Sequence, residues 1–244
     1  MQDVLSTPLP PDDLMILVCG HANREHFALS RRSAIVDGLL PFLHEAGIDL
    51  SSCKSILDFG CGCGRILAGW EGRLNGASLH GVDINPDLVA FCKNNIGFAT
   101  VTKCGPHPPL DFAEASFDFV YAVSVFTHLS RAGAVEWAKE MARIVMPGRT
   151  LVATFHGSWY DAKLAELSMA GLDELHRFGV YVHRFGDAAE GSNDYAAFIC
   201  SDIVPMLFRE FDVIKHYPGA SRGPTHFAAY QDVAIMRRKS SSSS

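Results

Sequence analysis

Residues 55–65, with the sequence SILDFGCGCGR, constrain the fold of this chain more than any other stretch. The first residues are apolar and suit a strand that is buried in a parallel sheet. Asp58 ends this strand, and Gly60, Gly62 and Gly64 follow it in alternation. Glycine lets the backbone turn tightly and lets a ligand approach where a Cβ atom would collide. Apolar residues then recur at helical spacing, so the stretch predicts a strand, a glycine turn and a helix.

This combination favours a nucleotide-type site at the carboxyl end of a strand. Dinucleotide enzymes carry the pattern G-x-G-x-x-G, which aims a helix N-terminus at a pyrophosphate. The pattern here is D-x-G-x-G-x-G, in which Asp58 precedes the glycines. A carboxylate at that place would repel a pyrophosphate but suits a ligand that carries an ammonium group. The residues alone leave a second interpretation open, a tight strand-to-helix turn that binds no ligand.

A second acid follows at the end of another predicted strand, LHGVD, which closes on Asp83. Asp83 lies at the sequence distance where nucleotide-binding folds place an acid on the ribose hydroxyls. Asn85 can cap the next helix, and Pro86 suits its first position. The alternative is that Asp83 only ends a strand. Strands and helices continue to alternate as far as residue 155, which predicts a parallel sheet with helices on both faces.

With these residues, the chain resembles the class I S-adenosylmethionine-dependent methyltransferases, and among them the small-molecule methyltransferases. Residues 58–64 have the form of that family's first motif, and the run FDFVYAVSVFTHL at 117–129 resembles its fourth motif. The resemblance is strong from about residue 56 to 155 and weak on both sides. One departure is that Cys61 and Cys63 occupy variable positions of the first motif. The family implies a Rossmann-like, doubly wound sheet of about seven strands, mostly parallel, with an antiparallel last strand.

The resemblance also implies a cofactor, S-adenosyl-L-methionine, and residues that hold it. The acid and glycines of the first motif would hold its methionine end, the second acid its ribose, and a proline-rich loop at 104–111 its adenine. The expected cofactor-binding residues are Asp58, Gly60, Cys61, Gly62, Gly64, Asp83, Ile84, Cys104, Gly105, Leu110 and Ser124. Leading helices cover the cofactor in this family, so Arg24, Arg31 and Arg32 could face its carboxylate. The other interpretation of these arginines is a solvated basic face.

The expected reaction is methyl transfer to a small organic acceptor, at oxygen or nitrogen. His156 follows a predicted strand directly and is the candidate general base, with His128 as runner-up, because histidine titrates near neutrality. Phe126, Tyr160 and Tyr181 are the candidate acceptor-binding residues. Two other functions remain open: a regulator that binds S-adenosylmethionine without catalysis, and, less favoured, an NAD-dependent oxidoreductase. The identity of the acceptor is not predicted.

Composition excludes other classes of partner. The net charge of −6 and the lack of a basic stripe argue against nucleic acid as a partner. No apolar run is long enough to span a membrane, and the N-terminus lacks a signal peptide, so we expect a cytoplasmic protein. The seven cysteines are an odd number and suit reduced core residues. The C-x-C pair has no second cluster, so we expect no metal. The oligomeric state is not predicted.

The 244 residues, 48% of them hydrophobic, suffice for one domain with a full core. Within it we expect an irregular insertion that covers the acceptor, and a low-complexity serine tail that is disordered. The expected parts are an N-terminal helical cap at 1–50, a cofactor-binding core at 51–156, the insertion at 157–200, a closing helix and strands at 201–239, and the tail at 240–244.

Overall fold

The computed structural model describes residues 6–240 of the chain and divides it into two compact units. The first unit extends to Cys104 and takes in Thr225–Phe227 from much later in the sequence. The second unit comprises Gly105–Pro224 and the chain from Ala228 onward. The predicted disordered tail lies outside the described residues from position 241 on.

Seven strands form one sheet in the order β3-β2-β1-β4-β5-β9-β8, which confirms the predicted mostly parallel, Rossmann-like fold. β1 is parallel to β2, β2 to β3, and β4 to β5, whereas β9 is antiparallel to both β5 and β8. The antiparallel last strand is therefore confirmed as well. The strands are β1 (Ser55–Phe59), β2 (Ser78–Asp83), β3 (Ala99–Lys103), β4 (Phe117–Ala122), β5 (Val145–Phe155), β8 (Phe211–Tyr217) and β9 (Asp232–Arg238).

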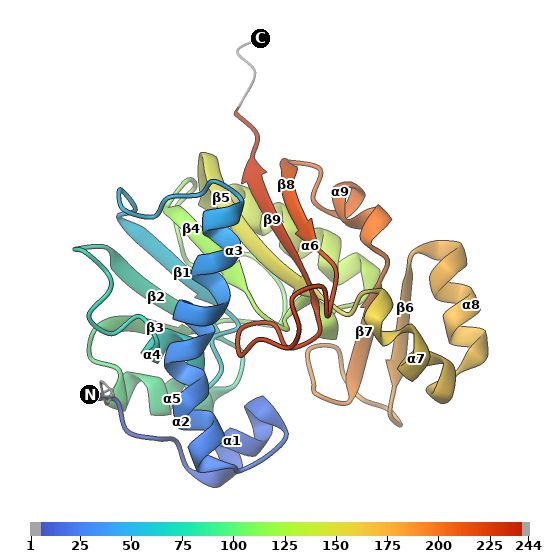
Figure 1. Cartoon of the computed structure of the whole chain (residues 1–244), viewed down its shortest axis with the longest axis horizontal. Coiled ribbons are helices and arrows are strands. Elements are labelled where there is room, and N and C mark those ends of the chain that lie inside the picture. The colour runs from blue at the N-terminus through green and yellow to red at the C-terminus, as the bar shows by residue number, and fades with distance from the viewer. Residues whose placement is uncertain (1–5, 241–244) are drawn as a thin grey trace. The chain divides into compact units, whose positions relative to one another are not determined.

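Helices of the first unit run beside strands β1 to β3, and α2 and α3 form one nearly continuous column (Figure 1). We expected residues 21–45 to be helical, with Pro41 either kinking this helix or starting a new one. The structure has the second arrangement, because α3 begins at Leu40 with Pro41 in its first turn, and a π-helical segment at Ala34–Leu39 precedes it. The predicted helix after the glycine turn is present, but it ends at Ala68, before the apolar position Trp70. The helices are α1 (Asp12–Cys19), α2 (Arg24–Ser33), α3 (Leu40–Glu45), α4 (Arg65–Ala68) and α5 (Pro86–Asn95).

Local sequence explains where these helices begin. The side chain of Asn85 accepts hydrogen bonds from the backbone of Asp87 and Leu88 at 2.9 and 3.2 Å, which confirms the predicted cap of α5. Asn23 caps α2 in the same way. A buried cluster then packs α1, α2, the glycine turn and α5 together; its members are Met15, Phe27, Cys63 and Leu88.

In the second unit, α6 (Arg131–Ile144) begins at its predicted cap, Ser130, which accepts a hydrogen bond from Gly133 at 3.0 Å. We expected Pro147 and Gly148 to separate this helix from the next strand. β5 instead begins at once, and both residues lie where its register with β4 shifts between Phe117 and Phe119. Such an irregularity tolerates proline, which has no N–H to donate to the sheet.

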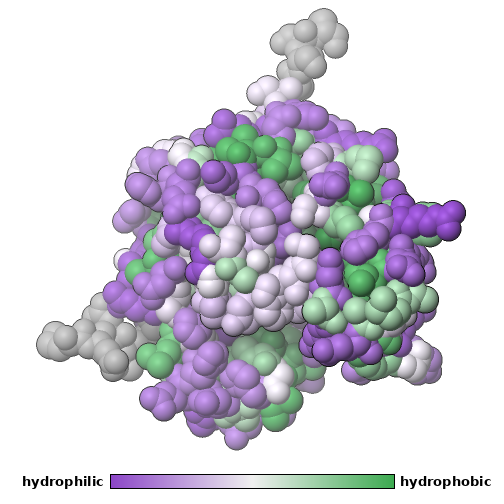
Figure 2. All heavy atoms as spheres, turned by 45° about the vertical axis from the view of Figure 1, so that its right-hand side comes forward, coloured by the Kyte–Doolittle hydropathy of each residue, from purple (hydrophilic) through white to green (hydrophobic). Residues whose placement is uncertain are grey.

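The expected insertion forms a small layer of its own. β6 (Val180–Arg184) and β7 (Tyr195–Ile199) pair as an antiparallel hairpin, as predicted. The one helix expected before them is two, α7 (Asp161–Leu167) and α8 (Met169–Phe178), because Ser168 ends the first and caps the second. Figure 1 shows both helices beside the hairpin, and Figure 2 shows hydrophobic surface on this side, where Leu167, Met169 and Phe178 are exposed.

The segment after the hairpin also differs from expectation. We predicted one helix from residue 201 to 209, capped by Ser201. The structure has a 3-10 turn at Ser201–Ile203 followed by the short helix α9 (Val204–Leu207). The side chain of Ser201 donates a hydrogen bond to Asp232 at 3.0 Å instead of capping the helix.

Candidate functional site

The glycine turn is fastened to the end of the neighbouring strand. The backbone N–H groups of Gly60 and Cys61 both donate to the carbonyl oxygen of Val82, at 2.9 and 3.0 Å. Gly60, Gly62 and Gly64 have φ angles of 77°, 56° and 75°. Residues with a Cβ rarely adopt this left-handed region, so the turn requires glycine for its backbone alone.

Two of the three glycines also make room for the protein itself. A Cβ on Gly64 would lie 2.2 Å from Cδ1 of Ile96, and a Cβ on Gly62 would lie 3.0 Å from Cγ2 of Val18 in α1. We expected the absent side chains to admit a ligand. At Gly62 and Gly64 the space is occupied by α1 and by the end of α5, which leaves Gly60 as the glycine for which close ligand approach remains a prediction.

Asp83 joins the second motif to the first. One carboxylate oxygen accepts a hydrogen bond from Gly62 N–H at 2.8 Å, and the other accepts from Asn85 N–H at 2.9 Å. Burial raises the pKa of this carboxyl group, and backbone N–H groups from Asn85, Gly62 and Ile84 oppose the rise. The two motifs are separate in the sequence. The hydrogen bond between Gly62 and Asp83 joins them in the structure.

Apolar surface adjoins this acid. Ile84 is 41% exposed although it is a large hydrophobic residue, and the backbone of Cys104 donates to the carbonyl of Asp83 at 3.0 Å. Burial, together with the negative charge of Asp83, raises the pKa of the Cys104 thiol to about 11. The neighbourhood of Asp83 thus offers hydrogen-bond acceptors beside an apolar contact, as a ribose and an attached base require.

Asp58 and the motif cysteines are buried under the turn. Both Cys61 and Cys92 direct their thiols at the carbonyl oxygen of Gly62, with S···O distances of 3.7 and 3.4 Å. Burial raises the pKa of Cys63, and the Cys61 pKa is raised by its contact with Cys92 and by burial. These thiols are packing groups. Over residues 6–240 no cluster of three or more His, Cys, Asp or Glu side chains could hold a metal ion.

Arg24 and Arg31, in the leading helices, both contact groups within the chain. Arg24 forms an exposed ion pair with Asp12 at 2.8 Å. Arg31 is buried, and its guanidinium donates to the carbonyl oxygens of Thr7 and Pro8 at 2.7 and 3.3 Å. Arg31 therefore fastens the N-terminal segment and is not part of the solvated basic face that we considered.

In the second unit, the predicted residue Ser124 belongs to a closed set of hydrogen bonds. Ser124 N–H donates to Thr154 Oγ1 at 2.8 Å, Thr154 Oγ1 donates to Gln231 Oε1 at 2.6 Å, and Gln231 Nε2 donates to Ser124 Oγ at 2.7 Å. Ser124 also has a φ of 58°, which is uncommon outside glycine and concentrates at functional sites. Sequence reasoning missed Gln231, because nothing in the loop before β9 signals it.

His156 is held in one tautomer. Its Nδ1 lies 3.1 Å from the carbonyl oxygen of Ala197, which can only accept, so Nδ1 carries the proton and Nε2 has the lone pair. Its ring lies 4.4 Å from that of Tyr160 and 5.4 Å from that of Phe198. Burial, with a smaller effect of nearby His128, lowers the His156 pKa to about 4. His156 is therefore neutral at pH 7 with a proton-accepting nitrogen.

His128 forms hydrogen bonds with the insertion. Its Nδ1 lies 3.0 Å from the carbonyl oxygen of Tyr195, and its own carbonyl accepts a hydrogen bond from Gly191 at 2.9 Å. Burial lowers the His128 pKa, while backbone contacts with Tyr195 and Ser192 oppose the shift. Both ends of this residue are thus used to hold the loop that joins β6 to β7.

An aromatic surface lies next to His156. The rings of Trp159 and Tyr230 are stacked, with centroids 4.0 Å apart and planes 4° from parallel, and the ring of Tyr160 meets Trp159 edge-on at 4.9 Å. Trp159 is 43% exposed, so one flat aromatic side chain remains partly open. Tyr230 was not singled out by sequence reasoning, since a lone tyrosine in a loop carries no signal.

Three other predicted site residues lie in the second unit. Phe126 is fully buried and lies 5.0 Å from Phe208, so it has no exposed face for an acceptor. Tyr181 is partly buried, and it packs against the core of the insertion beside Gly171. Leu110 is buried, and its N–H donates to the carboxylate of Glu140 at 2.7 Å. We assign Phe126 to packing, while acceptor binding by partly exposed Tyr181 remains a prediction.

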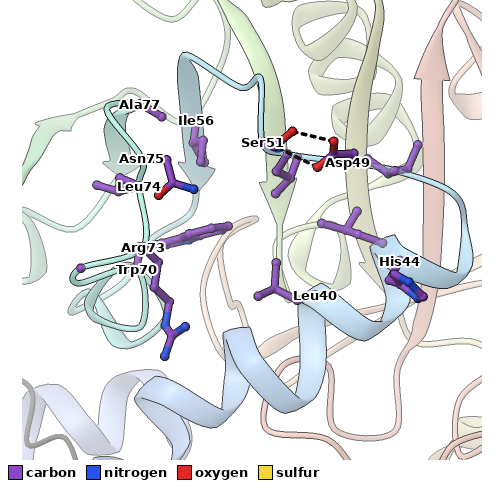
Figure 3. A pocket seen from close by; sticks show the side chains of 14 residues that line it. Leu40, His44, Asp49, Ser51, Ile56, Trp70, Arg73, Leu74, Asn75 and Ala77 are labelled. Carbon is purple, nitrogen blue, oxygen red and sulfur yellow. Dashed lines mark hydrogen bonds between the residues drawn. The ribbon is translucent and has the colours of Figure 1, made fainter.

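The first unit also has an open cavity of about 500 Å³, shown in Figure 3. Trp70 extends into it from one side and Leu40 of α3 faces it from the other, with Asp49 and Ser51 at its rim. Ile56 and Ala77, which also line it, lie where β1 begins and just before β2. The cavity is therefore at the amino ends of these strands, whereas the glycine turn and Asp83 lie at their carboxyl ends.

Comparison with known proteins supports the family resemblance. Residues 56–148 match the family model described as "Methyltransferase domain". Methyltransferase GfsG of Streptomyces halstedii is 27% identical over 109 residues, 43% of this chain and 38% of that protein. Phthiotriol/phenolphthiotriol dimycocerosates methyltransferase 1 of Mycobacterium ulcerans (strain Agy99) is 28% identical over 150 residues, 59% of this chain and 49% of that protein. The matches thus span less than half the length of these relatives.

Solved structures show the same fold. An S-adenosylmethionine-dependent methyltransferase from Methanosarcina mazei superimposes with a TM-score of 0.61 at 20% identity, covering 82% of this chain and 97% of that one. The 1,6-didemethyltoxoflavin-N1-methyltransferase of Burkholderia thailandensis, with bound 1,6-didemethyltoxoflavin and S-adenosylhomocysteine, gives a TM-score of 0.56 at 14% identity, covering 96% and 92%. At these identities the likeness establishes the fold. Over residues 6–240 no helix is long and apolar enough to cross a membrane.

Proposed function

This chain contains a class I methyltransferase domain, and we propose that it transfers a methyl group from S-adenosylmethionine to a small organic acceptor. The proposal rests mainly on one hydrogen bond. At the end of β2, the carboxylate of Asp83 accepts a hydrogen bond from the Gly62 N–H group at 2.8 Å. This bond joins the acid of the second motif to the glycine turn of the first. A turn that bound no ligand would not need a half-buried acid with acceptor capacity left over.

The residues of the first unit fit the proposed cofactor. S-adenosylmethionine, when bound, supplies a methyl group that is activated by a sulfonium. Asp83 would accept hydrogen bonds from the ribose hydroxyls, and exposed Ile84 would lie against the adenine. Asp58 and Gly60 would hold the methionine end, whose ammonium group suits a carboxylate. Cys104 would contribute its backbone, since its thiol has a raised pKa and stays protonated at pH 7.

For the acceptor we propose a small organic molecule with a flat, apolar part. Partly exposed Trp159, supported by its stack on Tyr230, offers an aromatic face, and Tyr160 adds a phenol hydroxyl. The names of the Mycobacterium ulcerans relative and of the toxoflavin enzyme also refer to organic molecules as their substrates. We further propose His156 as the proton acceptor when the acceptor is a hydroxyl, because its Nε2 lone pair is available.

The low basicity of His156 limits this last role. A group with a pKa of about 4 is a weak base at pH 7. His156 would therefore remove a proton only as the hydroxyl oxygen becomes acidic during attack, and an amine acceptor would need no base before attack. Ser124, Gly105 and Leu110 remain predicted cofactor contacts, and the expected cytoplasmic location remains a prediction.

The test begins with binding. Titration calorimetry with S-adenosylhomocysteine and, separately, with NAD should give binding of the first compound only. The protein is then incubated with S-adenosylmethionine labelled in the methyl group and with a cell metabolite extract, and label should appear in a new compound. Binding without any transfer of label would favour the non-catalytic regulator. Binding of NAD alone would refute the proposal.

A further inference from the structure

Arg65 is a cation for which residues 6–240 provide no carboxylate. It directly follows the glycine turn, and within the described part of the chain its Nη1 donates a hydrogen bond to the carbonyl oxygen of His226, at 2.6 Å. Its Nε atom is buried and has no hydrogen-bond partner. Other arginines of the chain form ion pairs, as Arg143 does with Glu140 and Arg149 does with Asp118. A buried N–H group without a hydrogen-bond partner is costly, and the described residues supply no acceptor for this one. A bound ligand with an acceptor oxygen would remove that cost.

The residue that accepts this bond, His226, has a second imidazole beside its own. The rings of His26 and His226 lie 5.0 Å apart, and the ring of His21 meets His26 edge-on, also at 5.0 Å. Nδ1 of His21 accepts a hydrogen bond from Asn23 N–H at 3.2 Å, so His21 is oriented by the start of α2. Among the described residues, the side chains of His26 and His226 have no hydrogen bond to a carboxylate. Both can therefore donate to a ligand.

The segment that brings His226 here is firmly placed within the first unit. Phe227 is buried, and its Cβ lies 2.5 Å from where a Cβ of Gly38 would be, inside the π-helical segment. Its ring also lies 6.4 Å from that of Phe42. With the Arg65 bond to the His226 carbonyl, these contacts fix the backbone of His226 relative to the guanidinium.

The charges around the cluster favour an anion. Burial and the nearby positive charges of His26 and Arg65 lower the pKa of His226, and only Asp37 opposes them. An anionic ligand would reverse this balance by favouring the protonated imidazole. A carboxylate also matches the planar fork of a guanidinium, which can present two parallel N–H groups.

We propose that Arg65, His26 and His226 form a binding site for a carboxylate group, with His21 holding His26 in place. The inference rests on the proposed function for the origin of that group, because both the methionine end of the cofactor and an acidic methyl acceptor carry this chemistry. The site lies next to the glycine turn, since Arg65 is the residue after Gly64. The carboxylate binds by charge and hydrogen bonds alone, and no covalent step is involved.

The first test needs no cofactor. Imidazole nitrogen signals of the whole protein are followed by NMR as pH is varied, in sodium acetate and in sodium chloride at equal ionic strength. We expect acetate to change the imidazole signals of His26 and His226, and to leave those of exposed His44 unchanged as an internal reference. Substituting Arg65→Gln should abolish the acetate effect, whereas Arg73→Gln in the same unit should preserve it. No difference between acetate and chloride at His26 and His226 would overturn the proposal.

The second test distinguishes the two sources of the carboxylate. Calorimetry compares S-adenosylhomocysteine with methylthioadenosine, which lacks the amino-acid end. If the site holds the cofactor carboxylate, Arg65→Gln weakens S-adenosylhomocysteine binding about tenfold or more and leaves methylthioadenosine binding unchanged. If the site serves the acceptor, neither affinity changes while the acetate response is lost. Equal weakening of both ligands would indicate a structural role for Arg65 and overturn the proposal. A protein that binds neither ligand but still responds to acetate would refute the proposed function alone.

Discussion

Replacing Asp83 by asparagine should weaken cofactor binding through the ribose. A carboxylate has about four acceptor positions, and backbone N–H groups of Gly62, Asn85 and Ile84 approach this one. The acceptor capacity that remains would serve the ribose hydroxyls. The amide of the Asp83→Asn variant would keep one acceptor oxygen and present a donor in place of the other, so at least one charge-assisted bond is lost. Such a bond contributes about 1.5 to 3 kcal/mol, which is roughly a 10- to 150-fold change in affinity.

The assay is a thermodynamic cycle between residue and ligand. Calorimetry measures S-adenosylhomocysteine and its 2′,3′-dideoxy analogue on wild type and on Asp83→Asn. Removing the hydroxyls should cost the wild type about 1.5 kcal/mol more than it costs the variant, because the variant has already lost the partner. Asp87→Asn, in the exposed first turn of α5, is the matched control and should behave as wild type.

Folding must be separated from binding here, since the asparagine amide would face a backbone N–H. Urea unfolding of Asp83→Asn gives that structural cost independently of the ligand. The reasoning is refuted if the dideoxy analogue loses as much affinity on the variant as on wild type. In that case the ribose lies elsewhere, and Asp83 serves only to fasten the glycine turn.

Three further predictions concern stability and pH. Gly64→Ala should destabilise the protein by about 2 to 4 kcal/mol in urea unfolding, because of backbone strain and the clash with Ile96. Adding Ile96→Val should recover part of this loss. Simple additivity of the two changes would contradict the packing argument. Because burial lowers the His156 pKa from 6.5 to about 4, its contribution to stability is present above pH 6.5 and is lost as pH falls toward 4. Wild type should therefore lose about 3 kcal/mol of unfolding free energy over this window that His156→Asn does not lose, and parallel curves would exclude the assignment. Thr154→Val should cost about 1 to 3 kcal/mol by leaving the Ser124 N–H and Gln231 without their partner, while Thr154→Ser should keep most of the stability; equal losses would argue against the hydrogen-bonded set.

The sequence by itself determined the elements whose signals are local. Asn85 caps α5 because its side chain reaches the N–H groups of the next two or three residues, and Ser130 caps α6 in the same way. The glycine turn is equally local, since its left-handed backbone angles need glycine wherever the turn lies. The alternation of strands and helices then left few topologies for the sheet, and the observed parallel order is among them.

Helix lengths and interruptions were less predictable. The column from residue 24 to 45 has a continuous apolar side, but only the tertiary structure shows a π-helical segment at Ala34–Leu39, where Phe227 packs against Gly38. Likewise α4 is a single turn, although the apolar spacing after the glycines would suit a longer helix. Packing against other segments decided the place of the π-helical segment and the length of α4. Helix propensity describes a residue by itself and does not include such contacts.

The candidate site shows the same division. Asp83 could be found from its spacing to the glycines, but Gln231, Tyr230 and His226 come from a loop with no motif, and the fold alone brings them to Ser124, Trp159 and Arg65. The role of Gly62 also changed, because its neighbour is Val18, 44 residues earlier in the chain. The local sequence around a residue largely determines its backbone conformation, and the residue type determines its chemistry. Its partners depend on which distant segments the folded chain places against it, and those contacts exist only after the hydrophobic core has formed.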